Sequence, residues 1–247
     1  MSQWWKSPFF GGGAGFAFAA AFFFTAAFFR AAIAANLSCT LASVKKYVAV
    51  AGTIGAGKTS LVAWLVKRYG LVPFFEPNED NPYLEDFYAD MKKWAFHSQV
   101  FFLSHKLKLH QELLASTKPA VIDRTIYEDA EIFARSLKNQ RYISSRDWAV
   151  YERLYEGIKK TLRPPDVLVA LTCSLSATKK RIARRGRAME SAIPDAYLRR
   201  LHGLYDRWFE SYDLGPIVRV DTTKLDYVEN LVDLIELQQK LDNALDR

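Results

Sequence analysis

The pattern of hydrophobic and polar positions predicts an α/β protein from Val44 onward. Short apolar runs rich in Val, Ile and Phe alternate with longer amphipathic stretches, as in a parallel sheet whose strands are joined by helices. The expected strands are Tyr47–Ala51, Val72–Phe75, Ala120–Asp123, Val167–Thr172 and Ile217–Val220. The expected helices are Lys58–Arg68, Tyr83–Met91, Trp94–Ser116, Glu128–Leu137, Ser145–Leu162, Ala177–Arg185, Asp195–Tyr212 and Tyr227–Leu245. No repeat or linker interrupts this stretch, so residues 44–247 are expected to form a single domain.

Residues 1–43 have a different pattern, rich in Phe and Ala, and form an atypical apolar N-terminal extension. No residue from Ser7 to Phe29 is charged, and such a stretch is long enough to span a bilayer or to form the core of a signal peptide. The alternative is that translation starts at Val44 and that residues 1–43 are translated upstream sequence. We favour this start over a membrane anchor at residues 8–29 and, more strongly, over export, so we expect a cytoplasmic protein.

The composition narrows the function classes without choosing one. The 247 residues are 50% hydrophobic and 25% charged, which suits a globular protein with a full core. Cys39 and Cys173 are too few and too far apart for a disulfide scaffold or a cysteine metal site. The net charge of +7 fits nucleic-acid binding and phosphate chemistry equally well, so the positions of the arginines have to decide.

One segment matches the phosphate-loop pattern G-x-x-x-x-G-K-[ST] without a gap. It consists of Gly52, Thr53, Ile54, Gly55, Ala56, Gly57, Lys58 and Thr59, with Ser60 next in the helix. The segment follows an expected strand and opens an expected helix, which is the context that the pattern requires. Glycines let backbone N–H groups surround an anion, Lys58 supplies a charge for the β and γ phosphates, and the Thr59 hydroxyl can ligate Mg²⁺. The segment therefore predicts nucleoside triphosphate binding, against the alternative of a glycine-rich turn without a ligand.

Charged residues also stand at the carboxyl ends of the second and third expected strands, where ligands bind in open parallel sheets. Glu76 is either a general base for an attacking hydroxyl or a surface acid that caps a turn. Asp123 can hold Mg²⁺, and Arg124 can neutralise charge on a transferring phosphoryl group. The alternative for these two is a surface ion pair, which we favour less because both stand at the mouth of the expected crevice.

A basic run covers residues 179–187. Arg181, Arg184 and Arg185 share one helix face, and a glycine then ends the helix before Arg187. Guanidinium groups on a mobile element suit a lid that closes over a triphosphate and excludes water. The alternative is a solvated basic face or a nucleic-acid patch, which the phosphate loop disfavours.

Together these segments resemble the deoxyribonucleoside kinase family, from about Lys46 to about Tyr212. The resemblance rests on the phosphate loop, Glu76-Pro77, Asn81-Pro82-Tyr83-Leu84, Phe87-Tyr88, Trp94 through Gln99, Asp123-Arg124-Thr125, Asp129, Arg181 through Glu190 and Ile193-Pro194. The first motifs are most similar to bacterial deoxyadenosine and deoxyguanosine kinases, and the lid also resembles animal deoxycytidine kinase. The resemblance implies a homodimer and a three-layer P-loop kinase fold, with a five-stranded parallel sheet, flanking helices and an arginine-rich lid.

The resemblance also assigns roles to single residues. Glu76 looks like the base that deprotonates the sugar 5′-hydroxyl, and Arg124 like the residue that steadies this hydroxyl and the phosphoryl group. Asp123 stands where the family has an acidic Mg²⁺ partner, often Glu. The further matches are the lid arginines Arg181, Arg185 and Arg187 and the pair Tyr88 and Glu190, which binds the 3′-hydroxyl in the family.

For base recognition, the resemblance leaves alternative residues open. Gln99, or Ser98 if the alignment shifts by one residue, matches the amide that reads the base edge. Gln99 is the better chemical candidate because an amide both donates and accepts. Asp129 matches a second polar group on the base, and Phe133 is either an aromatic of the base pocket or a core residue.

The base-sensing arginine of the family falls near His105 or Lys106, and this leaves the base preference open.

We expect an ATP- and Mg²⁺-dependent kinase that phosphorylates the 5′-hydroxyl of a deoxyribonucleoside, with purines and foremost deoxyadenosine favoured. The rivals are a nucleoside monophosphate kinase of the thymidylate type and a membrane-tethered nucleotide-binding module. A nucleic-acid binder comes last, because the basic residues concentrate in the lid.

Overall fold

The computed structural model describes residues 46–75, 81–187, 190, 193–224 and 231–245. All of these belong to one unit, Leu37–Arg247. The expected N-terminal extension, the start at Val44, the anchor at residues 8–29 and the candidate base Glu76 lie outside the described residues. Among the described helices, none combines the length and the apolar character that a membrane span needs.

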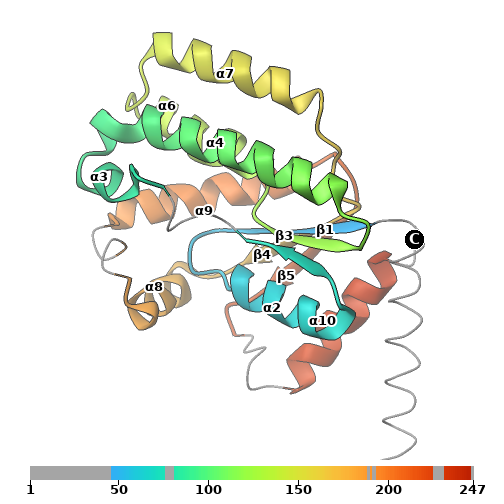
Figure 1. The fold of residues 1–247 in the computed structure, drawn as a ribbon. Helices are drawn as coiled ribbons and strands as arrows, with labels where there is room; N and C mark the ends of the chain where they lie inside the picture. The colour runs from blue at the N-terminus through green and yellow to red at the C-terminus, as the bar shows by residue number, and fades with distance from the viewer. Residues whose placement is uncertain (1–45, 76–80, 188–189, 191–192, 225–230, 246–247) are drawn as a thin grey trace, which may run out of the picture. The chain divides into compact units, whose positions relative to one another are not determined.

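A five-stranded parallel sheet forms the centre of this unit, as the sequence predicts (Figure 1). The strands are β1 (Tyr47–Gly52), β2 (Val72–Phe74), β3 (Ala120–Asp123), β4 (Val167–Thr172) and β5 (Ile217–Asp221). Their order across the sheet is β2-β3-β1-β4-β5, and all four pairings are parallel. The winding reverses between β1 and β3, so the carboxyl ends of these two strands border the crevice where such sheets bind ligands.

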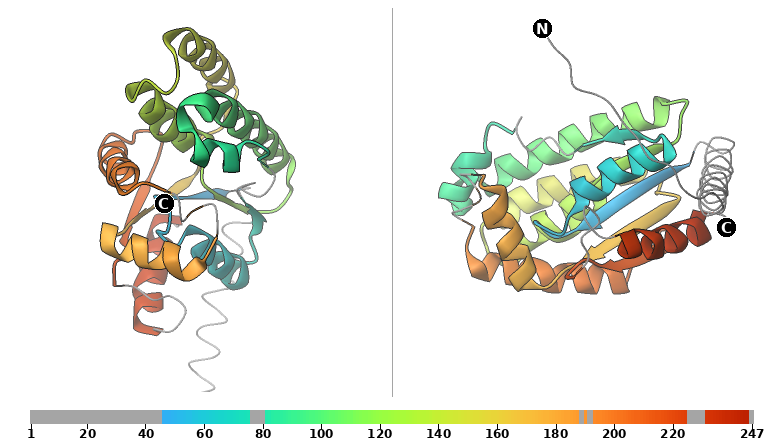
Figure 2. Two further views of the ribbon diagram at one scale, coloured as in Figure 1. Left: turned by 90° about the vertical axis from the view of Figure 1, so that its left-hand side faces the viewer. Right: turned by 90° about the horizontal axis from the view of Figure 1, so that it is seen from below.

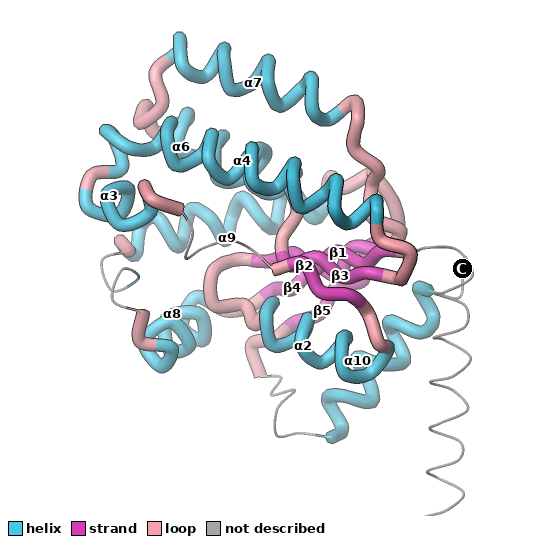
Figure 3. Tube along the Cα trace, in the orientation of Figure 1, coloured by secondary structure: helices cyan, strands magenta, loops and turns pink. Residues whose placement is uncertain are grey.

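Helices cover both faces of the sheet. The described helices are α2 (Lys58–Tyr69), α3 (Leu84–Ala89), α4 (Met91–Ala115), α5 (Ile126–Glu128), α6 (Arg135–Asn139), α7 (Ser145–Lys159), α8 (Leu175–Arg185), α9 (Asp195–Glu210) and α10 (Leu231–Leu245). In the view from below, α2 and α10 lie across one face of the sheet (Figure 2). The other face carries α4 and α9, so the strands lie between two helical layers (Figure 3).

The core explains these layers, because successive side chains of a strand point to opposite faces. In β1, Val48 and Val50 pack in one buried cluster with Leu61 of α2 and Leu241 of α10. The alternate residues of β1 belong to a second cluster, which includes Leu201 of α9. Every residue of β1 is buried, which is why its sequence is a continuous apolar run, as is typical of a central strand in a parallel sheet.

The helix expected at Glu128–Leu137 is divided into three elements. Between α5 and α6 lies a π-helical turn, η1 (Asp129–Ala134), in which the N–H of Arg135 donates to the carbonyl of Ala130, five residues back. This wider turn contacts both α4 and α9. Turns of this kind change the direction of side chains and occur often at functional sites.

The other expected elements are present with ends shifted by a few residues. The strand β2 ends at Phe74, so Phe75 has already left the sheet. The helix α4 begins at Met91, three residues earlier than expected, because the Asp90 side chain accepts a hydrogen bond from the N–H of Lys93 (3.1 Å) and caps it.

Replacing Gly52 with alanine is expected to lower the free energy of unfolding by about 1–3 kcal/mol. Gly52 has φ +154°, and an added Cβ would lie 2.7 Å from the carbonyl oxygen of Leu171, its neighbour in β4. Urea unfolding followed by circular dichroism measures the effect. The control is Gly203→Ala in α9, whose Cβ would meet only a side-chain atom at 3.7 Å and which should not destabilise the protein. Equal stability of the Gly52 variant and the wild type would contradict the close approach of β1 and β4.

Candidate active site

The phosphate-loop segment connects the end of β1 to the start of α2. Gly57, at the N-terminal end of α2, has φ +97°, a left-handed conformation that glycine adopts without strain. The helix therefore begins at Lys58, and its first N–H groups and its dipole face the loop, which is the geometry of an anion site.

Lys58 is buried against this loop, with 8% of its surface exposed. Its Nζ donates to the carbonyl oxygens of Gly52 (2.9 Å) and Thr53 (3.1 Å). The ammonium group is thus held inside the loop by backbone carbonyls. From there it can reach an anion that the loop N–H groups surround.

Thr59 and Asp123 bring the phosphate loop and the end of β3 together. The Thr59 hydroxyl donates to Asp123 Oδ2 (2.7 Å). The other carboxylate oxygen, Oδ1, is buried and has no hydrogen-bond partner among the residues that the structure describes. A hydroxyl and a carboxylate with a free buried oxygen are oxygen ligands of the kind that Mg²⁺ prefers, so the pair fits a divalent cation.

Arg124 follows directly on β3 and is 5% exposed. Its backbone is left-handed (φ +66°), and its N–H donates to the carbonyl of Val50 in β1 (3.0 Å). The guanidinium carbon lies 4.4 Å from the centre of the Phe133 ring, which is a cation–π contact. The positive charge is thus placed between the phosphate loop and an aromatic side chain of η1.

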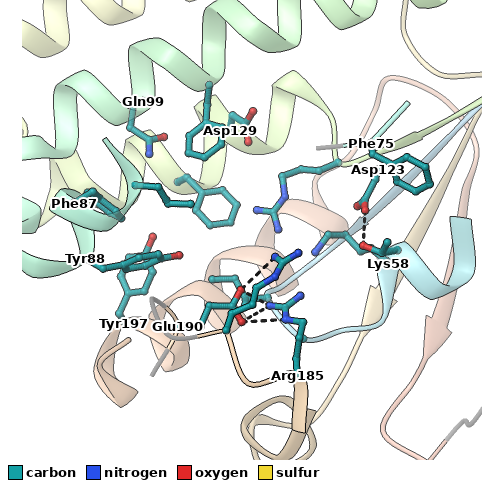
Figure 4. A pocket seen from close by; sticks show the side chains of 18 residues that line it. Lys58, Phe75, Phe87, Tyr88, Gln99, Asp123, Asp129, Arg185, Glu190 and Tyr197 are labelled. Atoms are coloured by element: carbon teal, nitrogen blue, oxygen red, sulfur yellow. Dashed lines mark hydrogen bonds and ion pairs between the residues drawn. The ribbon is translucent and has the colours of Figure 1, made fainter. Parts of the chain in front are cut away.

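One cavity of about 210 Å³ extends from the phosphate loop to α4 and η1. Lys58 and Asp123 line it at one end, and Gln99 and Asp129 line it at the other (Figure 4). Thr59 and Arg124 also line the cavity. Phe75, which precedes Glu76 in the chain, also lines this cavity although 45% of it is exposed. The cavity therefore joins the phosphate-loop residues to a second set of polar groups.

The polar groups at the far end come from α4 and η1. Gln99 is 3% exposed, and its Oε1 has no hydrogen-bond partner in the described part of the chain. Asp129 is equally buried, and Phe133 lies one turn further along η1 on the cavity wall. Ser98 is fully buried and accepts a hydrogen bond from Asn81 Nδ2 (3.2 Å). Of these two neighbours, Gln99 is the one among the described residues that line the cavity.

Two tyrosines form another wall of the cavity. Tyr88 of α3 and Tyr197 of α9 lie close together there (Figure 4). Burial raises the pKa of the Tyr197 phenol far above its ordinary value, and the nearby Tyr88 raises it further, so the hydroxyl stays protonated. The sequence does not single out Tyr197, because its place on the apolar stripe of α9 is equally typical of a core residue.

The lid arginines separate into two groups. Arg185 donates to both carboxylate oxygens of Glu190, and Arg187 Nη1 lies 3.7 Å from the same carboxylate (Figure 4). All three residues line the cavity. The expected lid arginines 185 and 187 are therefore at the site, paired with a carboxylate that the resemblance assigns to the acceptor.

Arg181 has a different position from the one expected for a lid arginine in contact with phosphate. Its Nη1 donates to Thr222 Oγ1 (3.0 Å) and to the carbonyl of Ala56 (3.4 Å), and it lies outside the described cavity lining. The guanidinium thus connects α8 and the end of β5 to the backbone of the phosphate loop.

The two candidates for a base-sensing cation are also outside the cavity lining that the structure describes. His105 is partly exposed and contacts the ring of Phe101. Lys106 is 1% exposed, and its Nζ donates to the carbonyl oxygens of Asp123 (3.0 Å) and Arg124 (2.8 Å). Lys106 therefore contacts the backbone after β3.

Glu128 is a buried carboxylate that the sequence does not reveal. Its Oε1 accepts from the N–H of Gly52 (3.2 Å) and from the Tyr205 hydroxyl (2.9 Å), and its Oε2 accepts from the N–H of Thr125 (2.8 Å). Burial raises the pKa of Glu128, while the charges of Arg124 and Lys58 lower it in part. The pairing with Thr125 forms a capping box, and its T-x-x-E spacing is the signal that could have indicated this contact.

Comparisons with known proteins agree with this site. The family model described as "Deoxynucleoside kinase" matches residues 48–245. The chain is 35% identical over 196 residues to the deoxyadenosine/deoxycytidine kinase of Bacillus subtilis, and the alignment covers 76% of this chain and 90% of that protein. It is 37% identical over 204 residues to the deoxyguanosine kinase of Lactobacillus acidophilus, covering 79% and 89%. The solved deoxyadenosine kinase of M. mycoides with bound dATP superposes with a TM-score of 0.71 at 29% identity, covering 80% of this chain and 99% of that one. On these findings, the chain belongs to the deoxynucleoside kinase family and is a phosphotransferase with an alcohol acceptor.

Proposed function

We propose that this deoxyribonucleoside kinase transfers the γ-phosphoryl group of ATP to the 5′-hydroxyl of a purine deoxyribonucleoside, with deoxyadenosine as the preferred acceptor. One observation carries the proposal. A single cavity is lined by Lys58 and Thr59 of the phosphate loop at one end and by the buried polar pair Gln99 and Asp129 at the other. This arrangement provides a site for a triphosphate tail and a site for a base, with the sugar between them.

At the donor end, the phosphate-loop N–H groups and Lys58 bind the triphosphate, and Arg124 neutralises charge on the transferring group. Arg185 and Arg187 supply further positive charge when the lid residues approach the donor. Thr59 and Asp123 would hold Mg²⁺, which supplies charge neutralisation for the phosphate oxygens when it is bound. Arg181 acts on the triphosphate indirectly, because its guanidinium contacts the backbone of the phosphate loop.

At the acceptor end, we assign the general base to Glu76, which follows β2. Phe75 on the cavity wall and the pairing of Phe74 with Ile122 in β3 support this assignment, because the chain leaves β2 beside the strand end that carries Asp123. Tyr88 and Glu190 bind the 3′-hydroxyl of the sugar, and the protonated Tyr197 adjoins Tyr88.

The base would bind between Gln99 and Asp129, with Phe133 against its face. The Gln99 amide can donate to a ring nitrogen and accept from an amino group, and the Asp129 carboxylate can accept from an amino group. Adenine presents both kinds of group. The names of the relatives include both purine and pyrimidine nucleosides, since one is a deoxyadenosine/deoxycytidine kinase and another a deoxyguanosine kinase, so the preference for deoxyadenosine is part of the proposal.

The proposal is tested with purified full-length protein and labelled ATP. Deoxyadenosine, deoxyguanosine, deoxycytidine and thymidine are each offered, and the corresponding 5′-monophosphates are offered in parallel. We expect phosphorylation of nucleosides only, with the highest kcat/KM for deoxyadenosine. Phosphorylation of the monophosphates instead would establish the nucleotide kinase rival, and a higher kcat/KM for a pyrimidine would overturn the base preference.

Replacing Asp129 with alanine is expected to lower kcat/KM for deoxyadenosine by about 10- to 100-fold, because a hydrogen bond to a charged group contributes about 1.5–3 kcal/mol. Thymidine, which has no exocyclic amino group, should lose less. Steady-state kinetics with both nucleosides measures the difference, and Asp206→Asn, an exposed acid of α9, is the control. An equal loss for both nucleosides would show that Asp129 does not read the base.

We also propose that the enzyme is a cytoplasmic homodimer whose kinase domain begins near Val44. A groove between α4 and α7 is lined by apolar residues, among them Val150 (57% exposed) and Leu154 (44%). Light scattering on the full 247-residue chain is expected to give twice its mass of 28.2 kDa, and Leu154→Asp is expected to give a monomer. A wild-type monomer, or a dimer that survives this substitution, would contradict the proposed interface.

A further inference from the structure

The turn after β3 has to aim two side chains in different directions. Asp123 faces the Thr59 hydroxyl, whereas the guanidinium of Arg124 lies over the Phe133 ring. Arg124 adopts a left-handed backbone conformation, which is unfavourable for residues other than glycine. A conformation of this kind persists only where its surroundings hold it. The groups that hold the backbone of residues 123–125 therefore matter for both side chains.

Lys106 is one of these groups. It lies on the same buried stripe of α4 as Gln99, two helical turns further on, and its Nζ donates to two consecutive carbonyl oxygens, those of Asp123 (3.0 Å) and Arg124 (2.8 Å). With 1% of its surface exposed, its ammonium group is held in place and shielded from water. A charged donor on both carbonyls fixes the orientation of the two peptide groups that they belong to.

Glu128 is the second group, and it holds the turn from the other side. Its Oε2 accepts from the N–H of Thr125, and its Oε1 accepts from the N–H of Gly52, the first residue of the phosphate loop. The Tyr205 hydroxyl adds a third hydrogen bond from α9. One fully buried carboxylate thus connects the turn after β3 directly to the phosphate loop.

We propose that Lys106 and Glu128 are positioning residues for phosphoryl transfer. They act through the backbone of residues 123–125 and Gly52, and they set Asp123 and Arg124 relative to the donor phosphates. Neither is among the described residues that line the cavity, so neither has to touch a substrate. Lys106 therefore does not read the base, although the base-sensing arginine of the family falls near it. This inference rests on the roles proposed above for Asp123 and Arg124.

The first test replaces Lys106 with methionine, which keeps an unbranched side chain only one atom shorter and removes the charge and the donors. We expect kcat to fall by about 10- to 100-fold, because small displacements at a reacting centre have effects of this size. The KM for ATP and the kcat/KM ratios among deoxyadenosine, deoxyguanosine and deoxycytidine should stay within about threefold, since the binding groups remain. Lys108→Met, an exposed neighbour on α4, is the matched control and should behave as wild type.

Two results would overturn the role of Lys106. An altered ratio among the three deoxynucleosides with kcat retained would show that Lys106 reads the base. A wild-type kcat in a folded Lys106→Met protein would show that the turn does not need it. If thermal unfolding shows that this variant does not fold, Lys106→Arg decides. Arginine keeps the charge but not the compact ammonium, so a reduced kcat with unchanged base ratios supports the role, and a wild-type kcat overturns it.

The second test is a double-mutant cycle with Glu128→Gln. This variant keeps one acceptor oxygen, so its kcat should fall less than that of Glu128→Ala, and Glu112→Gln on the exposed face of α4 is the control. Because both residues act on the same turn, the loss in the double variant Lys106→Met/Glu128→Gln should be smaller than the product of the two single losses. Fully multiplicative losses would overturn a shared mode of action.

Arg124→Ala separates this inference from the proposed function. If this variant keeps the wild-type kcat, the role of Arg124 itself is wrong and the proposed function fails at that point. If Arg124→Ala loses activity while folded Lys106 and Glu128 variants keep it, the proposed function stands and only the positioning role fails.

Discussion

Replacing Glu76 with glutamine is expected to lower kcat by about 10²- to 10⁴-fold, the range over which a positioned general base contributes to a rate. The amide has nearly the same shape but cannot accept the proton of the 5′-hydroxyl. ATP affinity should stay near the wild-type value, because the phosphate loop and Lys58 are unchanged. Single-turnover kinetics with deoxyadenosine measures the chemical step, and equilibrium titration measures ATP binding.

The matched control is Glu85→Gln, an exposed acid in the first turn of α3, which should leave kcat unchanged. Glu76→Asp should keep part of the activity, since a carboxylate remains but its reach is shorter. A Glu76→Gln enzyme with the wild-type single-turnover rate would show that another group accepts the proton. The alternative of an acid that only caps a surface turn would then be the better interpretation of Glu76.

Replacing Lys58 with alanine is expected to lower ATP affinity at least about 10-fold and kcat by about 10²- to 10³-fold. Losses of kcat of this size follow when one preorganised group that stabilises the charge developing in the transition state is removed. Lys58 Nζ lies within the loop, in contact with the carbonyls of Gly52 and Thr53. No other ammonium group is among the described residues that line the cavity. Calorimetric titration with ATP and steady-state kinetics measure the two effects.

Lys67→Ala, an exposed lysine in the last turn of α2, serves as the control for a lost positive charge on the same helix. Because Lys58 also satisfies two loop carbonyls, thermal unfolding should accompany the kinetics, and Lys58→Arg shows whether charge alone restores binding. A folded Lys58→Ala protein that binds ATP as the wild type does would contradict the assignment of this loop to the triphosphate.

Much of the fold could be predicted because its determinants are local. A strand that is buried on both faces needs a continuous apolar run, and β3 and β4 have the predicted boundaries for this reason. The phosphate loop is equally local, because the glycines, Lys58 and Thr59 are consecutive and have to lie between a strand and a helix. Gln99 and Asp129 reach the cavity as the resemblance implies, although they come from different elements.

The sequence could not reveal the buried charges or their partners. Lys106 is one of several lysines in α4. It is buried because this part of α4 packs against the end of β3, and the sequence does not show that contact. Glu128 and Tyr205 are 77 positions apart and meet through tertiary structure alone. The same holds for Arg181, whose acceptor Thr222 follows β5 and cannot be inferred from the spacing of the lid arginines.

The division of the helix after α5 shows a similar limit. Helical periodicity predicts a continuous helix, and a π-helical turn inserts one residue where contacts with α4 and α9 compensate for poorer helix geometry. This turn carries Asp129 and Phe133. Local propensity is thus overridden where the base would bind.

The left-handed backbone at Arg124 has a consequence for the evolution of this enzyme. Glycine would adopt φ +66° without the strain of about 1–2 kcal/mol that other residues incur there, so it would be the more stabilising choice for the backbone. Glycine would also remove the guanidinium from the cavity lining. Selection for thermostability and selection for turnover therefore oppose each other at this position. Stabilising substitutions in this kinase are better sought at positions away from the end of β3 that carries Arg124.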